Sequence, residues 1–107
     1  MRENLYSKAT KLFHILSHQG RLHILDELRK DEACVCHLQT VLNRPQAYVS
    51  QQLRVLREAD LVTDHRDGTL IYYRLADRQV ERLLEETLGP PGERTCMAEC
   101  SCPRCQE

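Results

Sequence analysis

Two short amphipathic segments joined by a tight turn constrain the fold of this chain more than any other feature. The segments, residues 34–42 and 45–59, each carry apolar side chains at helical spacing. The turn Asn43-Arg44-Pro45 joins them, and Pro45 also suits the first position of the new helix. The pattern therefore predicts two consecutive helices, the second of them running from Pro45 to about Ala59.

A hairpin is predicted directly after this helix pair. Residues 61–65 and 70–75 are rich in branched and aromatic side chains, which favour strands. The Asp67-Gly68 pair within the intervening residues 66–69 favours a tight turn between two antiparallel strands. A pair of short helices followed by such a ribbon is the order of a winged helix-turn-helix, in which the second helix of the pair enters the major groove of DNA.

Further helices are predicted on both sides of this motif. Apolar side chains at helical spacing predict a first helix that ends near Ser17 and a second that ends near Lys30. A last helix is expected after Asp77, a capping residue, and it ends at Gly89 because Pro90 cannot extend it. We therefore expect a mainly α fold with a β-hairpin wing (α+β), in the order ααααββα, over residues 1–89. Residues 90–107 lack apolar periodicity and are expected to form a flexible Cys-rich tail.

The cysteines of the chain fall into two groups. Cys34 and Cys36 open the first helix of the pair, and four others lie in the tail, namely Cys96, Cys100, Cys102 and Cys105. The N-terminus carries charges where an export signal would have an apolar run, and no apolar stretch is long enough to cross a bilayer, so we expect a cytoplasmic protein with no membrane partner. Because thiols stay reduced in that compartment, cysteines at such short spacings are expected to bind a metal or to act as redox centres.

The charge of the chain offers only weak support for a nucleic-acid partner. The net charge is −1, although residues 1–75 carry 11 Lys or Arg against 9 Asp or Glu. DNA binding is predicted instead from the helix pair and the ribbon, whose polar side chains can contact base edges or phosphates. The predicted DNA-binding residues are Gln46, Tyr48, Ser50, Gln51, Gln52, Arg54, Arg66 and Thr69. The simpler alternative is a glutamine-rich helix face that only meets solvent.

Over residues 8–88 the sequence resembles the ArsR/SmtB family of metal-responsive transcriptional repressors. The resemblance rests on the segments 12–18, 21–25, 49–62, 66–68 and 72–75. The sequence departs from the family pattern at Gln51 and Gln52, near which a His is common, and at Asp60, where a Gly is common. The resemblance implies a homodimer, held together by the first and last helices, that binds a twofold-symmetric operator in double-stranded DNA.

The resemblance also implies where a metal would bind. Cys34-Val35-Cys36 matches the Cys-Val-Cys motif that arsenic, cadmium and lead sensors of the family carry, but the third Cys that commonly follows in arsenic sensors is replaced by Gln39. Another zinc site of the family, with the pattern Asp-x-His, fails here because Asp77 is followed by Gln79. His37 is expected to cap its helix or to meet solvent rather than to bind the ion.

Cys34 and Cys36 are too few to hold an ion by themselves. Side chains two residues apart on a regular helix point about 200° apart, so this pair can share an ion only where the helix begins. The other ligands are expected from the tail, that is from Cys96, Cys100, Cys102 or Cys105. Three thiolates would suit As(III) or Sb(III), and four would suit Cd(II), Pb(II) or Zn(II). Both coordination numbers fit the sequence. The alternative is that the tail cysteines form an independent zinc knot or a flexible thiol cluster unrelated to sensing.

Our hypothesis is that the apo dimer represses transcription and that the ion releases it from DNA. One alternative is a thiol redox-responsive regulator, in which oxidation links Cys34 or Cys36 to a tail cysteine. A second is a metal-buffering protein, which predicts no sequence-specific DNA binding. We do not expect an enzyme or an organic cofactor, because the sequence holds no recognisable catalytic arrangement, phosphate loop or cofactor motif.

Overall fold

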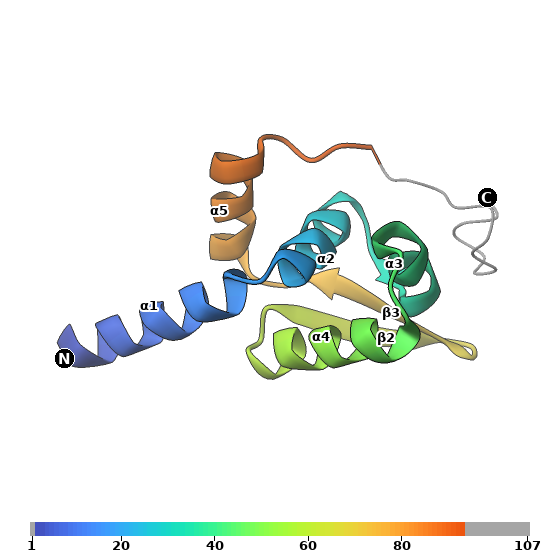
Figure 1. Cartoon of the computed structure of the whole chain (residues 1–107), viewed down its shortest axis with the longest axis horizontal. Coiled ribbons are helices and arrows are strands. Elements are labelled where there is room, and N and C mark those ends of the chain that lie inside the picture. The colour runs from blue at the N-terminus through green and yellow to red at the C-terminus, as the bar shows by residue number, and fades with distance from the viewer. Residues whose placement is uncertain (1, 94–107) are drawn as a thin grey trace.

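The structure, a computed structural model, describes residues 2–93 of the chain. This part consists of five helices and a small antiparallel sheet (Figure 1). In chain order the elements are α1 (Arg2–Leu16), α2 (Gln19–Lys30), β1 (Ala33–Cys34), α3 (Val35–Leu42), α4 (Gln46–Glu58), β2 (Val62–Asp67), β3 (Leu70–Leu75) and α5 (Arg78–Leu88). This is the predicted winged helix-turn-helix with one additional strand, β1.

Strand β1 turns the predicted two-stranded ribbon into a three-stranded sheet. The strand order is β1-β3-β2, and Ala33 lies opposite Tyr73 while Cys34 lies opposite Tyr72. A strand of two residues is too short to show the alternation of apolar and polar side chains that identifies a strand in a sequence. It forms because it pairs with β3, which is far away in the chain. Cys34 therefore belongs to a strand, and α3 begins one residue later than the sequence predicts.

The wing turn is one residue further along than the Asp67-Gly68 pair suggests. Asp67 pairs with Leu70, which leaves Gly68 and Thr69 as the two turn residues. Gly68 has a φ of +66°, a conformation that glycine adopts without strain at the first position of a tight hairpin turn. Asp67 is consequently the last residue of β2 rather than part of the turn.

The core lies where α2 and α4 cross and where α5 covers them. Ile24 and Leu25 from α2, Leu53 and Leu56 from α4, and Leu84 from α5 are all 2% exposed or less. These positions follow the helical spacing of each segment, so the buried face of α4 is fixed by its sequence. The opposite face of α4 stays free for contact with another molecule.

A left-handed residue ends α4 and starts the wing. Asp60 has a φ of +61°, and its amide donates to the carbonyl of Arg57 at 3.0 Å. The amide of Leu61 donates to the carbonyl of Leu56 at 3.0 Å, which completes a Schellman motif. A left-handed position favours glycine, so the structure explains why Gly is common there in the family that the sequence resembles.

Helix α1 extends away from the rest of the molecule (Figure 1). It leaves large apolar side chains in solvent, with Leu5 63%, Tyr6 68% and Phe13 58% exposed. Within residues 2–93, none of the helices combines the length and the apolar character that a bilayer crossing requires.

Candidate DNA interface and thiol site

The exposed face of α4 carries most of the residues predicted to contact DNA. Gln46, Ser50, Gln51 and Arg54 are exposed, while Val49 on the same helix is fully buried. Between this face and the sheet lies a shallow hollow lined by Ala47, Ser50, Gln51, Arg54, Arg57 and Tyr73. Polar and cationic side chains around a hollow between a helix and a wing can reach both base edges and phosphates.

Two of the predicted DNA-binding residues are less exposed: Gln52 is buried and Tyr48 is partly buried. Gln52 is 6% exposed, and its Oε1 accepts a hydrogen bond from Nε of Arg21 at 2.8 Å. Arg21 also donates from Nη1 to the carbonyl of Ile15 at 3.3 Å. Tyr48 is half-buried, and the guanidinium of Arg44 lies 5.0 Å from its ring centre. The bond between Gln52 and Arg21 holds α4 against α2, whereas Arg44 lies in the turn directly before α4.

Arg66, in β2, and Thr69, in the hairpin turn, are both exposed, as expected. Sequence reasoning missed Arg57, which is also exposed and lies two helical turns after Ser50 on the same face of α4. Its Nη1 lies 3.0 Å from Oδ2 of Asp64 in β2, so it connects the helix to the wing. The helical spacing alone was a sufficient signal for this residue.

The two described cysteines lie together beside the wing strand. Cys34 is 2% exposed and extended (φ −87°, ψ 167°), and Cys36 is half-buried in the first turn of α3. Both belong to a small cluster with Tyr72 and Leu70, which we call the thiol cluster. On one regular helix the two side chains would point about 200° apart. Because Cys34 is extended and precedes the helix, this restriction does not apply to the pair.

The thiol cluster does not form a complete metal site by itself. Among the residues that the structure describes, no three His, Cys, Asp or Glu side chains are grouped so that they could hold an ion. The predicted tail ligands Cys96, Cys100, Cys102 and Cys105 lie outside the described residues. The donor set of Cys34 and Cys36 is therefore chemically suited to a thiophilic ion and needs further ligands.

The expectation that His37 caps its helix or meets solvent is wrong. His37 is 1% exposed, and its Nε2 lies 3.4 Å from Oε1 of Glu27 on α2. Burial alone would raise the pKa of Glu27, but hydrogen bonds from His37 and Lys30 and the charge of Lys30 outweigh burial and lower this pKa. No local sequence pattern indicates this pairing, because the two residues lie on different helices.

A second set of contacts connects the thiol cluster to the outer strand of the wing. The ring of Tyr72, opposite Cys34, stacks on His65 of β2 with ring centres 5.6 Å apart and planes inclined by 22°. Nε2 of His65 lies 2.7 Å from Oε2 of Glu32, which directly precedes β1. The segment that carries Cys34 is thus attached to both strands of the wing.

Comparison with known proteins identifies the class of regulator that this fold and site define. The sequence profile described as "Bacterial regulatory protein, arsR family" matches residues 18–64. The arsenical resistance operon repressor of Bacillus subtilis (strain 168) is 36% identical over 88 residues, which cover 81% of this chain and 84% of that protein. The chain therefore belongs to the ArsR/SmtB family of transcriptional regulators, in line with the prediction that it is not an enzyme.

Other relatives agree with this assignment. The transcriptional repressor SmtB of Mycobacterium tuberculosis (strain ATCC 25618 / H37Rv) is 35% identical over 85 residues, or 79% of this chain, and the chain spans 63% of that protein's length. Reduced HlyU from Vibrio cholerae N16961 superposes with a TM-score of 0.74 at 30% identity, covering 79% of this chain and 93% of that chain. The homodimeric winged helix-turn-helix domain of Mycobacterium bovis Mb0332 superposes with a TM-score of 0.73 at 30% identity, covering 81% of each chain.

Proposed function

We propose that the protein is a transcriptional repressor that binds operator DNA as a homodimer and is released when a thiophilic ion binds to its cysteines. The observation that carries this proposal is the place of Cys34 in the sheet. Cys34 lies on β1, directly opposite Tyr72 of the wing strand β3, so an ion at the thiol cluster acts on the wing itself.

DNA binding is supported by the exposed face of α4 and the wing beside it. We assign base and phosphate contacts to the exposed residues Gln46, Ser50, Gln51 and Arg54 of α4 and to Arg66 and Thr69 of the wing. Gln52 and Tyr48 act indirectly in this proposal, since Gln52 bonds to Arg21 of α2 and Tyr48 packs against Gly20 of α2. Because the cationic side chains of Arg54 and Arg66 can neutralise phosphates, affinity for the operator should fall with salt.

A homodimer is supported by an apolar groove that α1 leaves open. Leu12 and Ile15 of α1, Val55 and Ala59 of α4, and Leu83 of α5 line this groove, and the exposed side chains of Leu5 and Phe13 continue it. An apolar surface of this kind is stabilised by a second copy of the same helices. The homodimeric domain of Mycobacterium bovis has the same fold.

The proposed signal passes from the thiol cluster into the wing. Binding of an ion to Cys34 and Cys36 would change the backbone of β1, and the pairing of Cys34 with Tyr72 transmits this change to β3. The stack of Tyr72 on His65 and the contact of His65 with Glu32 extend it to β2. A coupling of about 1–3 kcal/mol between ion and DNA is typical of such regulators and corresponds to roughly a 5- to 150-fold change in affinity.

The ion and the full ligand set follow from donor chemistry. Thiolates suit As(III) or Sb(III) when three of them bind and Cd(II), Pb(II) or Zn(II) when four bind. Cys34 and Cys36 supply two ligands, and we assign the others to the tail cysteines Cys96, Cys100, Cys102 and Cys105. In this proposal residues 1–89 form the DNA-binding and dimerisation domain and residues 90–107 form the tail that completes the site.

Operator release during ion titration tests the proposal. Fluorescence anisotropy of a labelled operator is followed while Cd(II), Pb(II), Zn(II) or As(III) is added to the reduced protein. We expect at least one ion to release the DNA. We also expect the Cys34→Ser/Cys36→Ser variant to bind the operator and to ignore the ion. If none of the four ions releases the wild-type protein, the sensor function is wrong.

Truncation after Gly92 separates the two parts of the site. We expect the truncated protein to bind the operator, because the described contacts of α4 and the wing stay intact. It should respond weakly or not at all to the ion, since Cys34 and Cys36 alone supply too few ligands. Normal release of the truncated protein would remove the tail from the site.

Redox regulation is a second candidate function. One structural relative is described as reduced HlyU, and the present chain brings Cys34 and Cys36 into one cluster. In this alternative a two-electron oxidant, such as a peroxide, joins two thiols into a disulfide with loss of two protons. Reversible release of the operator by peroxide, with no response to any of the four ions, would select this alternative.

A further inference from the structure

A second hollow lies beside α4, where the start of this helix meets the start of α2 and the end of α3. Its volume is about 600 Å³. Arg44, His18 and His23 contribute nitrogen donors to its lining, and none of the described residues around it is acidic. We call it the basic hollow. A lining of this kind suits a negatively charged group that accepts hydrogen bonds.

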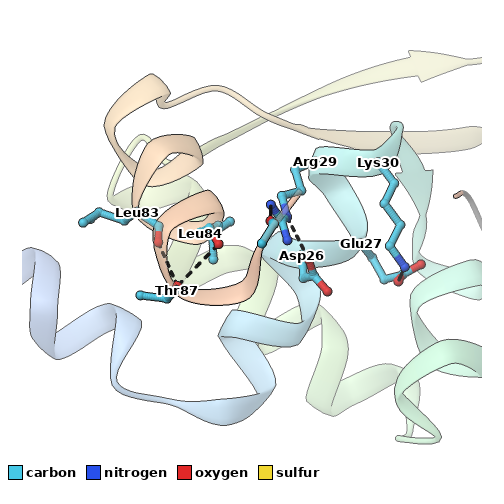
Figure 2. Close-up of polar contacts among 8 residues, drawn as sticks. Asp26, Glu27, Arg29, Lys30, Leu83, Leu84 and Thr87 are labelled. Atoms are coloured by element: carbon cyan, nitrogen blue, oxygen red, sulfur yellow. Dashed lines mark hydrogen bonds and ion pairs between the residues drawn. The ribbon is translucent and has the colours of Figure 1, made fainter. Parts of the chain in front are cut away.

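Arg44 brings to the basic hollow a charge that is not already compensated. It is exposed in the turn directly before α4, and within residues 2–93 no carboxylate lies within ion-pair distance of it. Arg29 of α2 is instead 4% exposed and paired with Asp26 (Figure 2), and it also donates to the carbonyl of Gly89. The charge of Arg29 is used inside the protein, whereas the charge of Arg44 is available to a ligand.

Aromatic packing sets the position of Arg44. Its guanidinium carbon lies 5.0 Å from the ring centre of Tyr48, within the range of a cation–π contact. Tyr48 in turn lies against Gly20 at the start of α2, where an added Cβ would be 2.1 Å from the Tyr48 hydroxyl oxygen. Gly20 therefore makes room for the ring, and the ring supports Arg44. A guanidinium that is held in this way loses less conformational freedom when it binds a phosphate.

His18 supplies a second donor to the basic hollow. Its Nδ1 accepts a hydrogen bond from the amide of Arg21 at 3.4 Å, because His18 caps α2. In the neutral ring the proton is therefore on Nε2, which can donate to a phosphate oxygen. The ring centre of His18 lies 6.3 Å from that of Tyr48. The guanidinium of Arg44 and the imidazole of His18 thus neighbour the same aromatic ring.

The two hollows beside α4 lie on opposite sides of this helix. Tyr48 lines the basic hollow and Arg57 lines the hollow next to the sheet, and their spacing of nine residues places them about 180° apart around the helix. Gln51 and Arg54 lie on the exposed face between them. A helix in the major groove has one sugar-phosphate strand along each side. The hollow next to the sheet therefore faces one strand, and the basic hollow faces the other.

We propose that the basic hollow binds a phosphate group of the DNA strand that lies on the far side of α4 from the wing. Arg44 and His18 contact the phosphate, and Tyr48 is a positioning residue because it supports Arg44. This inference rests on the DNA binding in the proposed function and involves neither the cysteines nor the ion. It adds an anchor on the second strand, which fixes the register of α4 in the groove.

Operators with single neutral phosphates test this contact. Duplexes that carry a methylphosphonate at one backbone position at a time are titrated with the protein in the anisotropy assay. At the contacted position, wild-type affinity should fall roughly tenfold, the factor expected for loss of a hydrogen bond to a charged group. Arg44→Gln should weaken binding to the unmodified operator, and the methylphosphonate at that position should then cost little more. We call this dependence the Arg44 coupling.

Matched variants separate the contact from a general loss of affinity. Arg44→Lys keeps the charge and should keep part of the coupling. Tyr48→Phe keeps the ring and should keep the coupling, whereas Tyr48→Leu should lose most of it. His18→Asn keeps a capping residue at the start of α2 and should weaken the effect of the same phosphate. Arg82→Ala removes an exposed cation of α5 that lines neither hollow, and it should leave the coupling unchanged.

Two outcomes would overturn the proposal. If the effect of no methylphosphonate depends on Arg44, the basic hollow does not hold a phosphate. If the position that depends on Arg44 lies, within one half-site, on the same strand as the positions that depend on Arg54, the two hollows do not face opposite strands. An Arg44 coupling in a protein that no ion releases would keep this inference and refute the sensor function. Release by an ion without an Arg44 coupling would do the reverse.

Discussion

Replacing Gly20 by alanine is expected to destabilise the protein through a clash with Tyr48. A Cβ at Gly20 would lie 2.1 Å from Oη of Tyr48 and 3.1 Å from its Cζ. Since ordinary contacts begin at 3.4 Å, the hydroxyl must move by about 1.3 Å. Tyr48 cannot move freely, because it is half-buried, contacts Arg44 and lies beside His18.

The size of the effect follows from two opposing terms. Overpacking of a well-packed site costs typically about 1–3 kcal/mol. Alanine is a better helix former than glycine by up to about 1 kcal/mol, and this gain is smaller at the second residue of α2. We therefore expect a net loss of about 1 kcal/mol or more in the free energy of unfolding, which corresponds to a Tm lower by roughly 4–8 °C.

A double-mutant cycle identifies Tyr48 as the cause. Thermal unfolding is followed by far-UV circular dichroism at fixed protomer concentration for Gly20→Ala, Tyr48→Phe and the double variant. Because Tyr48→Phe removes the atom that clashes most closely, Gly20→Ala should cost much less in that background, with a coupling of about 1 kcal/mol. Operator affinity should follow the same pattern, since Tyr48 lies in the first turn of α4. An equal loss of Tm in both backgrounds would refute the reasoning.

The remaining predictions concern the end of α4, the buried carboxylate, the wing and the DNA face. Asp60→Gly should raise the free energy of unfolding in urea by about 0.5–1 kcal/mol, because Asp60 has a φ of +61° that glycine adopts without strain; a loss of stability would contradict this. Glu27→Gln should lower stability at neutral pH by about 2 kcal/mol. The pKa of Glu27 is lower in the folded state, so its stabilising contribution is lost as pH falls through that pKa, and the gap between Glu27→Gln and wild type in urea unfolding should narrow in acid. His65→Phe keeps a ring beside Tyr72 but removes the contact with Glu32, so ion-induced release in the anisotropy assay should weaken by roughly two- to fivefold while apo affinity changes little; unchanged release would exclude this contact from the coupling. Arg54→Ala should weaken operator binding and reduce the salt slope by about one, and an unchanged slope would argue against a phosphate contact.

Much of the fold could be predicted because its signals are local. The side chain of Asp77 accepts from the amide of Val80 at 3.0 Å, a cap that the residue type and its position announce. The turn before Pro45 and the hairpin around Gly68 are likewise set by residues that are neighbours in the chain. Local rules misplaced only details, such as the exact turn residues of the wing.

The candidate site was predictable in part. Helical spacing alone would have assigned Gln52, three residues after the buried Val49, to the inner face of α4 and would have added Arg57 to the outer face. The cysteine motif identified Cys34 and Cys36 but said nothing of what surrounds them. Their contact with Tyr72 depends on a strand pairing between residues that are far apart in the chain.

The sequence by itself determined the order of the elements, the buried face of α4 and the presence of thiols near the DNA-reading motif, because each of these depends on residues a few positions apart. Only the tertiary structure placed Cys34 on a strand of the wing, buried His37 beside Glu27 and fastened Gly89 to Arg29. Each of these contacts joins two elements whose spacing is set by the packed core, and no local pattern encodes such a spacing. The neighbours of Cys34 and the course of residues 90–93 are therefore properties of the fold.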